Sequence, residues 1–213
     1  VPQVSRGVST PTFTRATTAS VSDFEGKVNT ALSGESRFKG ARRVENLNDN
    51  SGLLSYSGAL PTGWTQPNNT GTQSIQASTL HSGENSITFE CAAGRQSISR
   101  TYTVAIGDEL RFSFDVESFE APAGSICRFL SGTDVTGNIA AANLAVGRMT
   151  TGVVTATSTS VVVKFGVGID SNRIGEFTAS GLMLENVTSQ SNQNPSEYVS
   201  SGVGTGAELA VVT

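Results

Sequence analysis

Apolar and polar residues alternate along most of this chain, and the alternation predicts β-strands. In the segment 109–117, every second residue from Leu110 to Val116 is apolar, and 160–168 and 86–91 alternate in the same way. A period of two places the apolar side chains on one face of a strand and the polar ones on the other. Strands with one buried and one wet face are typical of two packed antiparallel sheets.

Short β-rich runs of this kind follow one another with turn signals between them, such as Pro61-Thr-Gly63. The predicted strands are roughly Leu53–Tyr56, Gln73–Thr79, Ser86–Cys91, Gln96–Ala105, Glu109–Glu117, Ser125–Leu130, Thr151–Ala156, Ser160–Gly168 and Glu176–Val187. Eight or more strands favour a jelly roll over a seven-stranded immunoglobulin-like domain. The Cys, Trp, Cys order of that domain is also absent, because Trp64 precedes both cysteines. We therefore expect an all-β protein, an antiparallel jelly-roll β-sandwich over residues 46–190.

The N-terminal residues 1–45 hold little material for a core. Residues alternate from Phe13 to Val21, but both faces are mostly polar or small, while Lys27 to Leu32 accommodates one helical turn at most. A strand that buries so little is expected to pair with the edge of another sheet, in its own chain or in a neighbour. We predict an extended N-terminal arm over 1–45 and an extended C-terminal tail over 191–213.

Charge divides the chain at the same boundary. Residues 1–45 carry seven basic and four acidic side chains, a net charge of +3, and the rest carries seven and fourteen, a net charge of −7. A basic arm before an acidic body is typical of a segment that docks on a partner, although so modest an asymmetry also arises by chance. The candidate docking residues are Arg6, Phe13, Arg15, Arg42 and Arg43. Arg42 and Arg43, at the junction, have the alternative of bonding to acidic residues of the body.

Composition restricts the classes of function. The chain has 28 Ser, 25 Thr and 23 Gly, and its charged fraction is 15%, where about 25% is usual. The net charge of −4 disfavours nucleic-acid binding driven by bulk charge. No apolar stretch is long enough for a membrane span, and no motif for a cofactor occurs.

Candidate catalytic chemistry is sparse. His81 lies in a polar turn and is expected to be solvated, and Asp115 and Glu117 lie on the outer face of one strand, where they favour solubility. A glycoside hydrolase needs two carboxylates that face each other across a cleft, so we predict no enzyme and no metal site. Cys91 and Cys127 are expected to be two buried thiols, with a disulfide as the alternative if their strands are neighbours.

One loop has the composition of a sugar-binding site. Trp64 is followed by Gln66, Asn68 and Asn69. An aromatic ring stacks on the CH face of a sugar while amide groups bond to its hydroxyls. The alternative, which we favour, is that Trp64 plugs one end of the sandwich, because the preceding Leu-Pro-Thr-Gly turn directs it inward.

The opening of the chain resembles a recurrent segment of tailed-phage virion proteins, the head-spike-fibre and carbohydrate-binding-module-like group. The matching residues are Phe13-Thr-Arg-Ala-Thr17, Asp23-Phe-Glu-Gly26, Ser36-Arg-Phe38 and Arg43-Val-Glu-Asn-Leu47. The later part is similar at Leu60-Pro-Thr-Gly-Trp64, Ser99–Val104, Leu110–Val116, Leu182–Glu185 and Asn194–Val199. The resemblance covers roughly residues 10–200, and its later part is generic for jelly rolls.

This resemblance implies a structural component of a tailed-phage virion, made in the host cytoplasm and exposed on the particle surface. We expect a jelly-roll head decoration, cement or head-fibre protein whose arm docks on the major capsid protein or another virion protein. By analogy with other virion jelly rolls we expect a homotrimer. The alternative function is a glycan-binding module of a head or tail fibre, with host surface polysaccharide as its partner.

Overall fold

The computed structural model describes residues 46–67, 70–120, 122–131, 134–169, 172–190, 193, 195 and 198–200, and the backbone of 19–22, 28–31, 41–44 and 209–212. Its strands are β1 (Ala19–Ser22), β2 (Val28–Ala31), β3 (Ala41–Val44), β4 (Tyr56–Ser57), β5 (Leu60–Pro61), β6 (Thr72–Ala77), β7 (Asn85–Gly94), β8 (Gln96–Thr103), β9 (Glu109–Glu120), β10 (Ser125–Ser131), β11 (Asp134–Ala140), β12 (Gly147–Thr150), β13 (Val154–Thr155), β14 (Ser160–Val167), β15 (Arg173–Asn186) and β16 (Leu209–Val212). One 3-10 turn, η1 (Ala141–Asn143), follows β11. In the described residues no helix is long and apolar enough to cross a membrane.

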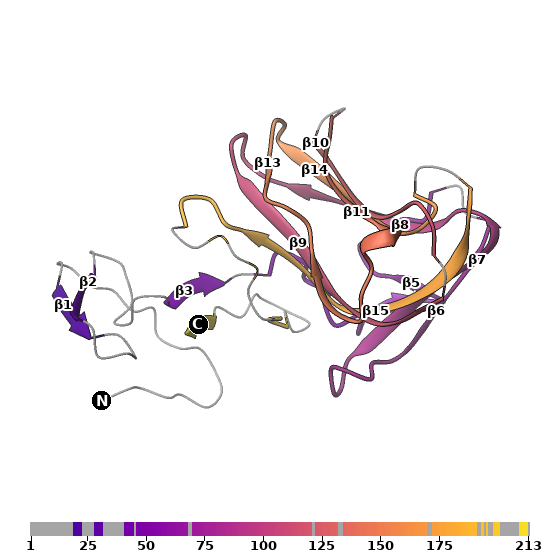
Figure 1. Ribbon diagram of the computed structural model, residues 1–213, viewed down its shortest axis with the longest axis horizontal. Coiled ribbons are helices and arrows are strands. Elements are labelled where there is room, and N and C mark those ends of the chain that lie inside the picture. The colour runs from indigo at the N-terminus through magenta and orange to yellow at the C-terminus, as the bar shows by residue number, and fades with distance from the viewer. Residues whose placement is uncertain are drawn as a thin grey trace.

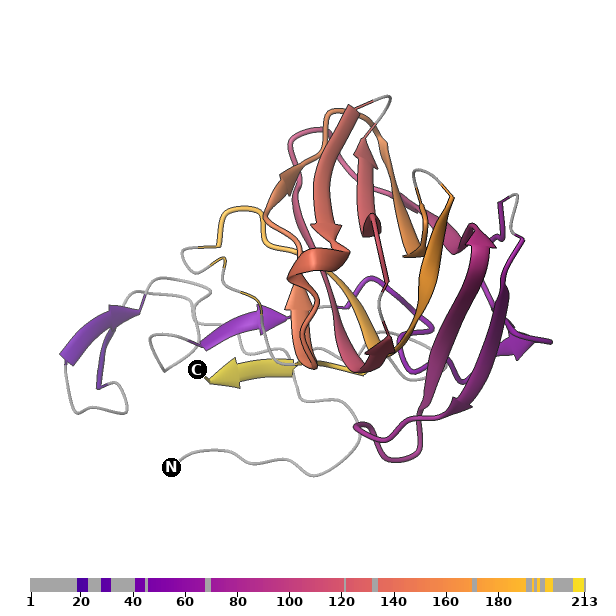
Figure 2. The same cartoon turned by 45° about the vertical axis from the view of Figure 1, so that its right-hand side comes forward.

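Two antiparallel sheets face each other (Figures 1 and 2). One has the order β11-β10-β14-β8, and the other has the order β12-β9-β15-β7-β6, with β13 also paired to β9. The chain crosses between the sheets repeatedly, from β7 to β8 to β9 to β10. The expected all-β fold, an antiparallel jelly-roll sandwich, is confirmed.

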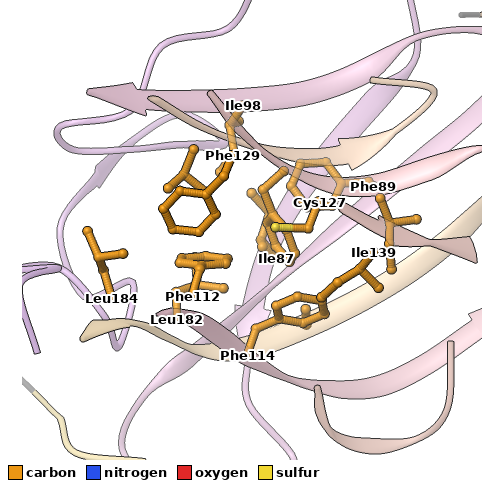
Figure 3. Close-up of a cluster of buried hydrophobic side chains, with 14 of the residues drawn as sticks. Ile87, Phe89, Ile98, Phe112, Phe114, Cys127, Phe129, Ile139, Leu182 and Leu184 are labelled. Atoms are coloured by element: carbon orange, nitrogen blue, oxygen red, sulfur yellow. The ribbon is translucent and has the colours of Figure 1, made fainter. Parts of the chain in front are cut away.

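Phenylalanine rings fill the space between the sheets, among them those of Phe89, Phe112 and Phe114 (Figure 3). The Phe165 ring centroid lies 4.6 Å from that of Phe114 and between 5.3 and 5.8 Å from those of Phe89, Phe112 and Phe177. All five side chains are fully buried. Four of them, Phe89, Phe112, Phe114 and Phe165, come from the alternating positions that the sequence assigned to the inner face, so the period of two identifies these core residues correctly.

Several local predictions differ from the structure. Of the predicted strand Thr151–Ala156, only Val154–Thr155 is a strand, β13. Of the predicted strand Leu53–Tyr56, only Tyr56 lies in a strand, at the start of β4, because Leu53 has a positive φ of 54° and lies inside a loop held by the Asn50 side chain. Asp134–Ala140 forms strand β11, which the sequence did not indicate. Val28–Ala31 is a strand paired with β1 rather than a helical turn, because that pairing supplies its backbone hydrogen bonds.

Both ends of the chain leave the sandwich together. Strand β16 pairs antiparallel with β3, with Leu209 opposite Val44 and Val212 opposite Ala41. The two strands lie side by side on one side of the sandwich (Figure 2). Nearer the body, Val199 is only 4% exposed, so the residues that pack on the sandwich extend beyond the expected boundary at 190. The three-part division of the chain itself stays a prediction.

Candidate functional site

Trp64, the proposed sugar platform, lies in the hydrophobic core. It is 4% exposed and belongs to the main cluster of buried residues. A ring buried to this extent cannot stack on a sugar at the surface. Gln66 is exposed, while Asn68 and Asn69 lie outside the described residues. Trp64 therefore offers no exposed aromatic platform, and it fills part of the sandwich interior.

A different aromatic ring of the same region is exposed. Tyr56 is 48% exposed and lies on the short hairpin of β4 and β5. The loop that presents it is braced, because the Asn50 side chain donates to Ser55 O at 2.6 Å and accepts from Ser55 N at 3.1 Å. Hydroxyls of Ser55 and Thr62 add a 2.8 Å hydrogen bond. An aromatic side chain held out by an ordered loop is suited to contact with a ligand or partner.

The docking arm is described only in part. Arg6, Phe13 and Arg15 lie outside the described residues. Arg42 and Arg43 lie on β3, opposite Val211 and Ala210 of β16. The prediction that these arginines dock on a partner, and its alternative that they bond to the body, therefore stay open.

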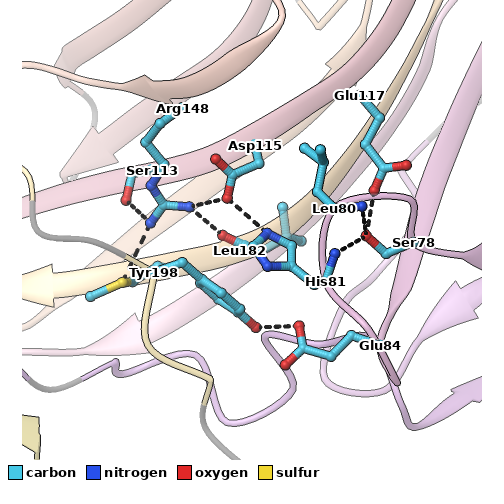
Figure 4. Close-up of polar contacts among 12 residues, drawn as sticks. Ser78, Leu80, His81, Glu84, Ser113, Asp115, Glu117, Arg148, Leu182 and Tyr198 are labelled. Atoms are coloured by element: carbon cyan, nitrogen blue, oxygen red, sulfur yellow. Dashed lines mark hydrogen bonds and ion pairs between the residues drawn. The ribbon is translucent and has the colours of Figure 1, made fainter.

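His81 and Asp115 form part of a polar cluster on the outer face of the larger sheet (Figure 4). His81 Nε2 lies 3.0 Å from Asp115 Oδ2, and Asp115 is 8% exposed. Arg148 of β12 donates to the same Asp115 oxygen at 2.8 Å, and also to Gly181 O at 2.8 Å and Ser113 Oγ at 2.7 Å. The expectation of a solvated histidine and a solvated Asp115 is therefore wrong.

Gly181 makes room for this cluster. It has a positive φ of 57° in a stretch of β15 where the register with β9 shifts. A Cβ at this position would come within 2.6 Å of Asp115 Oδ2 and 2.8 Å of His81 Nε2. Only glycine allows the histidine and the carboxylate to meet here. A single glycine inside a predicted strand is the sequence feature that could have indicated a close approach of other groups at this point.

Glu117 holds the loop that carries His81. Its carboxylate accepts hydrogen bonds from Ser78 Oγ at 2.6 Å, Thr79 Oγ1 at 2.7 Å and Thr79 N at 3.0 Å. Burial alone would raise the pKa of Glu117, but these hydrogen bonds lower it below its ordinary value. Ser78 Oγ in turn accepts from His81 N at 3.0 Å. Glu117 therefore positions the loop rather than only adding surface charge.

The C-terminal segment covers the cluster. The Tyr198 hydroxyl donates to Glu84 Oε2 at 2.8 Å and lies 3.1 Å from Ser51 Oγ. The Tyr198 ring lies 4.5 Å from the His81 ring, and the Arg148 guanidinium carbon lies 5.6 Å from the Tyr198 ring centroid. Because these partners of Tyr198 lie 50 or more residues away in sequence, spacing alone gave no indication of the contacts.

An open hollow lies farther along the same sheet face. It is lined by Glu90, Cys91, Ala92, Glu120, Ile174, Gly175 and Glu176. Glu176 of β15 lies directly opposite Glu90 of β7 and opposite Glu120 of β9. Three carboxylates thus form one row across three adjacent strands, and Ile174 beside them is 59% exposed. Such a surface offers hydrogen-bond acceptors next to an apolar side chain.

Neither a metal cluster nor a disulfide occurs in the described part of the chain. No three His, Cys, Asp or Glu side chains there come together to hold a metal ion. Cys91 and Cys127 are free and buried, and burial raises the pKa of the Cys127 thiol. The expectation of two buried thiols is confirmed.

No protein-family model matches the sequence, and no curated protein matches it. Among solved structures, the chain is similar to the enzymatically active domain of bacteriophage CBA120 tailspike protein 4, at 14% identity over 66% of this chain and a TM-score of 0.43. It is also similar to TmCBM61, solved in complex with beta-1,4-galactotriose, at 12% identity over 66% of this chain and 98% of that one, with a TM-score of 0.43. A third match is a carbohydrate-binding module of the β-sandwich superfamily, at 15% identity over 78% and 71% of the two chains and a TM-score of 0.36. The chain spans 21% of the tailspike domain that it matches.

Proposed function

We propose that this chain is a structural, non-enzymatic component of a tailed-phage particle. Its sandwich is displayed at the particle surface, and its N-terminal arm docks on the major capsid protein or another virion protein. The virion assignment comes from the sequence resemblance of the opening segment. The homotrimer expected from other virion jelly rolls belongs to this proposal.

The observation that carries the docking role is the common exit of the two chain ends. Asn46 lies at the exit of the N-terminal segment, and its side-chain amide donates to Val199 O of the C-terminal segment at 2.9 Å. Strands β3 and β16 continue the pairing outward. Attachment through this side leaves the remainder of the sandwich free, which is the geometry of a displayed module.

Decoration of particles that lack the protein tests this proposal. Full-length protein is added to such particles, in parallel with a variant that lacks residues 1–45, and occupancy is measured by particle imaging. We expect full occupancy with the intact chain and none with the truncated one. Occupancy that survives the truncation contradicts docking by the arm, and isolated single copies on the particle contradict the trimer.

Charge reversal separates docking from internal bonding at the junction. Arg42→Glu with Arg43→Glu is expected to abolish decoration without changing the melting temperature if these residues bind the partner. A large loss of melting temperature with decoration retained assigns them to the body instead.

Glycan binding is the second candidate function, and the hollow beside Glu176 favours it. Carboxylates accept hydrogen bonds from sugar hydroxyls, and the exposed Ile174 side chain provides an apolar contact for sugar CH groups. Host surface polysaccharide is then the partner. A glycan array probed with full-length protein tests it, with Glu176→Ala to remove the acceptor and Tyr56→Ala to remove the exposed ring. If Glu176→Ala abolishes glycan binding and Tyr56→Ala does not, the binding site is the hollow. If the intact chain binds no glycan, the glycan-binding function is rejected.

A further inference from the structure

The polar cluster and the exit of the chain ends are joined by the segment 198–200. Tyr198 lies over the cluster, with its hydroxyl bonded to Glu84 Oε2 at 2.8 Å and its ring 4.5 Å from that of His81. The neighbouring residue, Val199, is 4% exposed and packs with Met183. The segment is therefore seated on the sandwich by side chains on both of these residues.

Asn46 links this segment to the N-terminal part of the chain. Its amide nitrogen donates to Val199 O at 2.9 Å and to Leu182 O at 3.3 Å, while its amide oxygen accepts from Leu184 N at 3.1 Å and Asn48 N at 3.0 Å. Asn46 is 5% exposed. Every hydrogen-bonding position of this buried amide is used. Loss of the segment removes the 2.9 Å bond to Val199 O and leaves the buried amide nitrogen of Asn46 with only the longer bond to Leu182 O.

We propose that residues 198–200 form a clasp that holds both chain ends against the sandwich, and that opening the clasp frees the N-terminal arm. One side chain, that of Asn46, contacts strand β15 and the clasp at once. Release of Tyr198 withdraws Val199 O from Asn46 and removes one of the four contacts that fix the point where the arm leaves the body. The C-terminal segment thereby controls how firmly the docking arm is oriented.

The cluster beneath Tyr198 is built to receive this side chain. Arg148 and Asp115 hold each other at 2.8 Å, and Arg148 places its guanidinium over the Tyr198 ring. Burial is the main influence on the pKa of the Tyr198 hydroxyl and raises it. A neutral hydroxyl that donates to Glu84 and an aromatic face that receives a cation are both favoured in this position.

Amide hydrogen exchange on the free full-length protein tests the clasp. In Tyr198→Ala we expect exchange in 41–48 and 209–212 to accelerate by about tenfold, since about one net hydrogen bond is lost at each contact. Exchange in β7, β9 and the inner part of β15 stays unchanged. Tyr56→Ala, which removes a 48% exposed tyrosine ring outside the clasp, is the matched control and leaves exchange in 41–48 unchanged.

Two outcomes overturn the clasp. Unchanged exchange in 41–48 in Tyr198→Ala shows that the ends are held independently, and equal acceleration throughout the sandwich shows that Tyr198 is only a core residue. If Tyr198→Ala does not fold, Tyr198→Phe removes the bonds to Glu84 and Ser51 alone, and acceleration confined to 41–48 and 198–212 then decides the question. Because no particle is involved, a failed clasp is distinguishable from a failed docking function.

Discussion

Two aromatic residues close together in the sequence differ in their roles, because one is buried and the other is exposed. Trp64 is 4% exposed while Tyr56 is 48% exposed, although both lie in the same loop region of the sequence. The Leu-Pro-Thr-Gly turn before Trp64 predicted its burial, whereas the role of Tyr56 depends on bracing by Asn50, which sequence spacing does not reveal. His81 shows the same limit, because its partners Asp115 and Arg148 come from β9 and β12.

Trp64→Ala is expected to destabilise the sandwich by about 3–5 kcal/mol, because it removes a large buried side chain and leaves a cavity. Tyr56→Ala is the matched comparison and should cost less than about 1 kcal/mol, since most of what it removes is already exposed to solvent. Urea unfolding of the two variants measures the difference. A small loss for Trp64→Ala would mean that the ring contributes little to the core.

Glu117→Gln tests the hydrogen bonds that position the His81 loop. The pKa of Glu117 is lowered in the folded protein, so its contribution to stability is present above the ordinary unfolded value of about 4.3 and is lost as the pH falls through the folded value. We expect the variant to be less stable than the wild type at pH 7 and the two to converge as the pH falls through the lowered pKa of Glu117. Thermal melts across this range measure it, and a constant difference at all pH values contradicts the interpretation.

At the scale of strands, the period of two predicted the inner faces well and the outer faces poorly. Leu110, Phe112 and Phe114 are fully buried as expected. On the other side of β9, Ser113 and Asp115 are also buried, because the loop at His81 and the segment at Tyr198 cover that half of the sheet. Strand β11 escaped prediction because Gly137 and Asn138 lower its β-propensity. Alternation reports which residues share a face, but not what covers that face.

The glutamate row is an unfavourable feature of the larger sheet. Glu176 lies between Glu90 and Glu120 on the two neighbouring strands, and like charges directly opposite each other repel. We expect Glu176→Gln to raise the free energy of unfolding by about 0.2–1 kcal/mol at low salt. At about 1 M salt, where screening is strong, the gain should largely disappear. A destabilised variant would show that Glu176 makes a favourable contact in the row.

At the scale of the whole molecule, the two ends of the chain contribute differently to the sandwich. The buried hydrophobic residues of the described part run from Leu53 to Val199. The N-terminal boundary at residue 45 stays a prediction from charge and composition, because residues 1–45 hold little material for a core. The C-terminal boundary could not be predicted, because Tyr198 and Val199 are separated from their contacts by a polar stretch that resembles the tail after them.

Deletion of either end is expected to separate assembly from stability. Removal of residues 1–45 keeps Asn46 and every buried hydrophobic residue of the described part, so we expect a cooperative melt with only a small loss of melting temperature. Removal of 191–213 exposes the surface under Val199, takes the hydroxyl partner from Glu84 and leaves one donor bond of Asn46 unmade. Burying a valine contributes about 1.5–3 kcal/mol and a hydrogen bond about 1 kcal/mol, so the C-terminal deletion should lower the free energy of unfolding by at least about 2 kcal/mol. Chemical denaturation of both variants shows which deletion lowers the free energy of unfolding more. A larger loss from the N-terminal deletion would place residues 1–45 within the folding unit and would contradict their assignment as a docking arm.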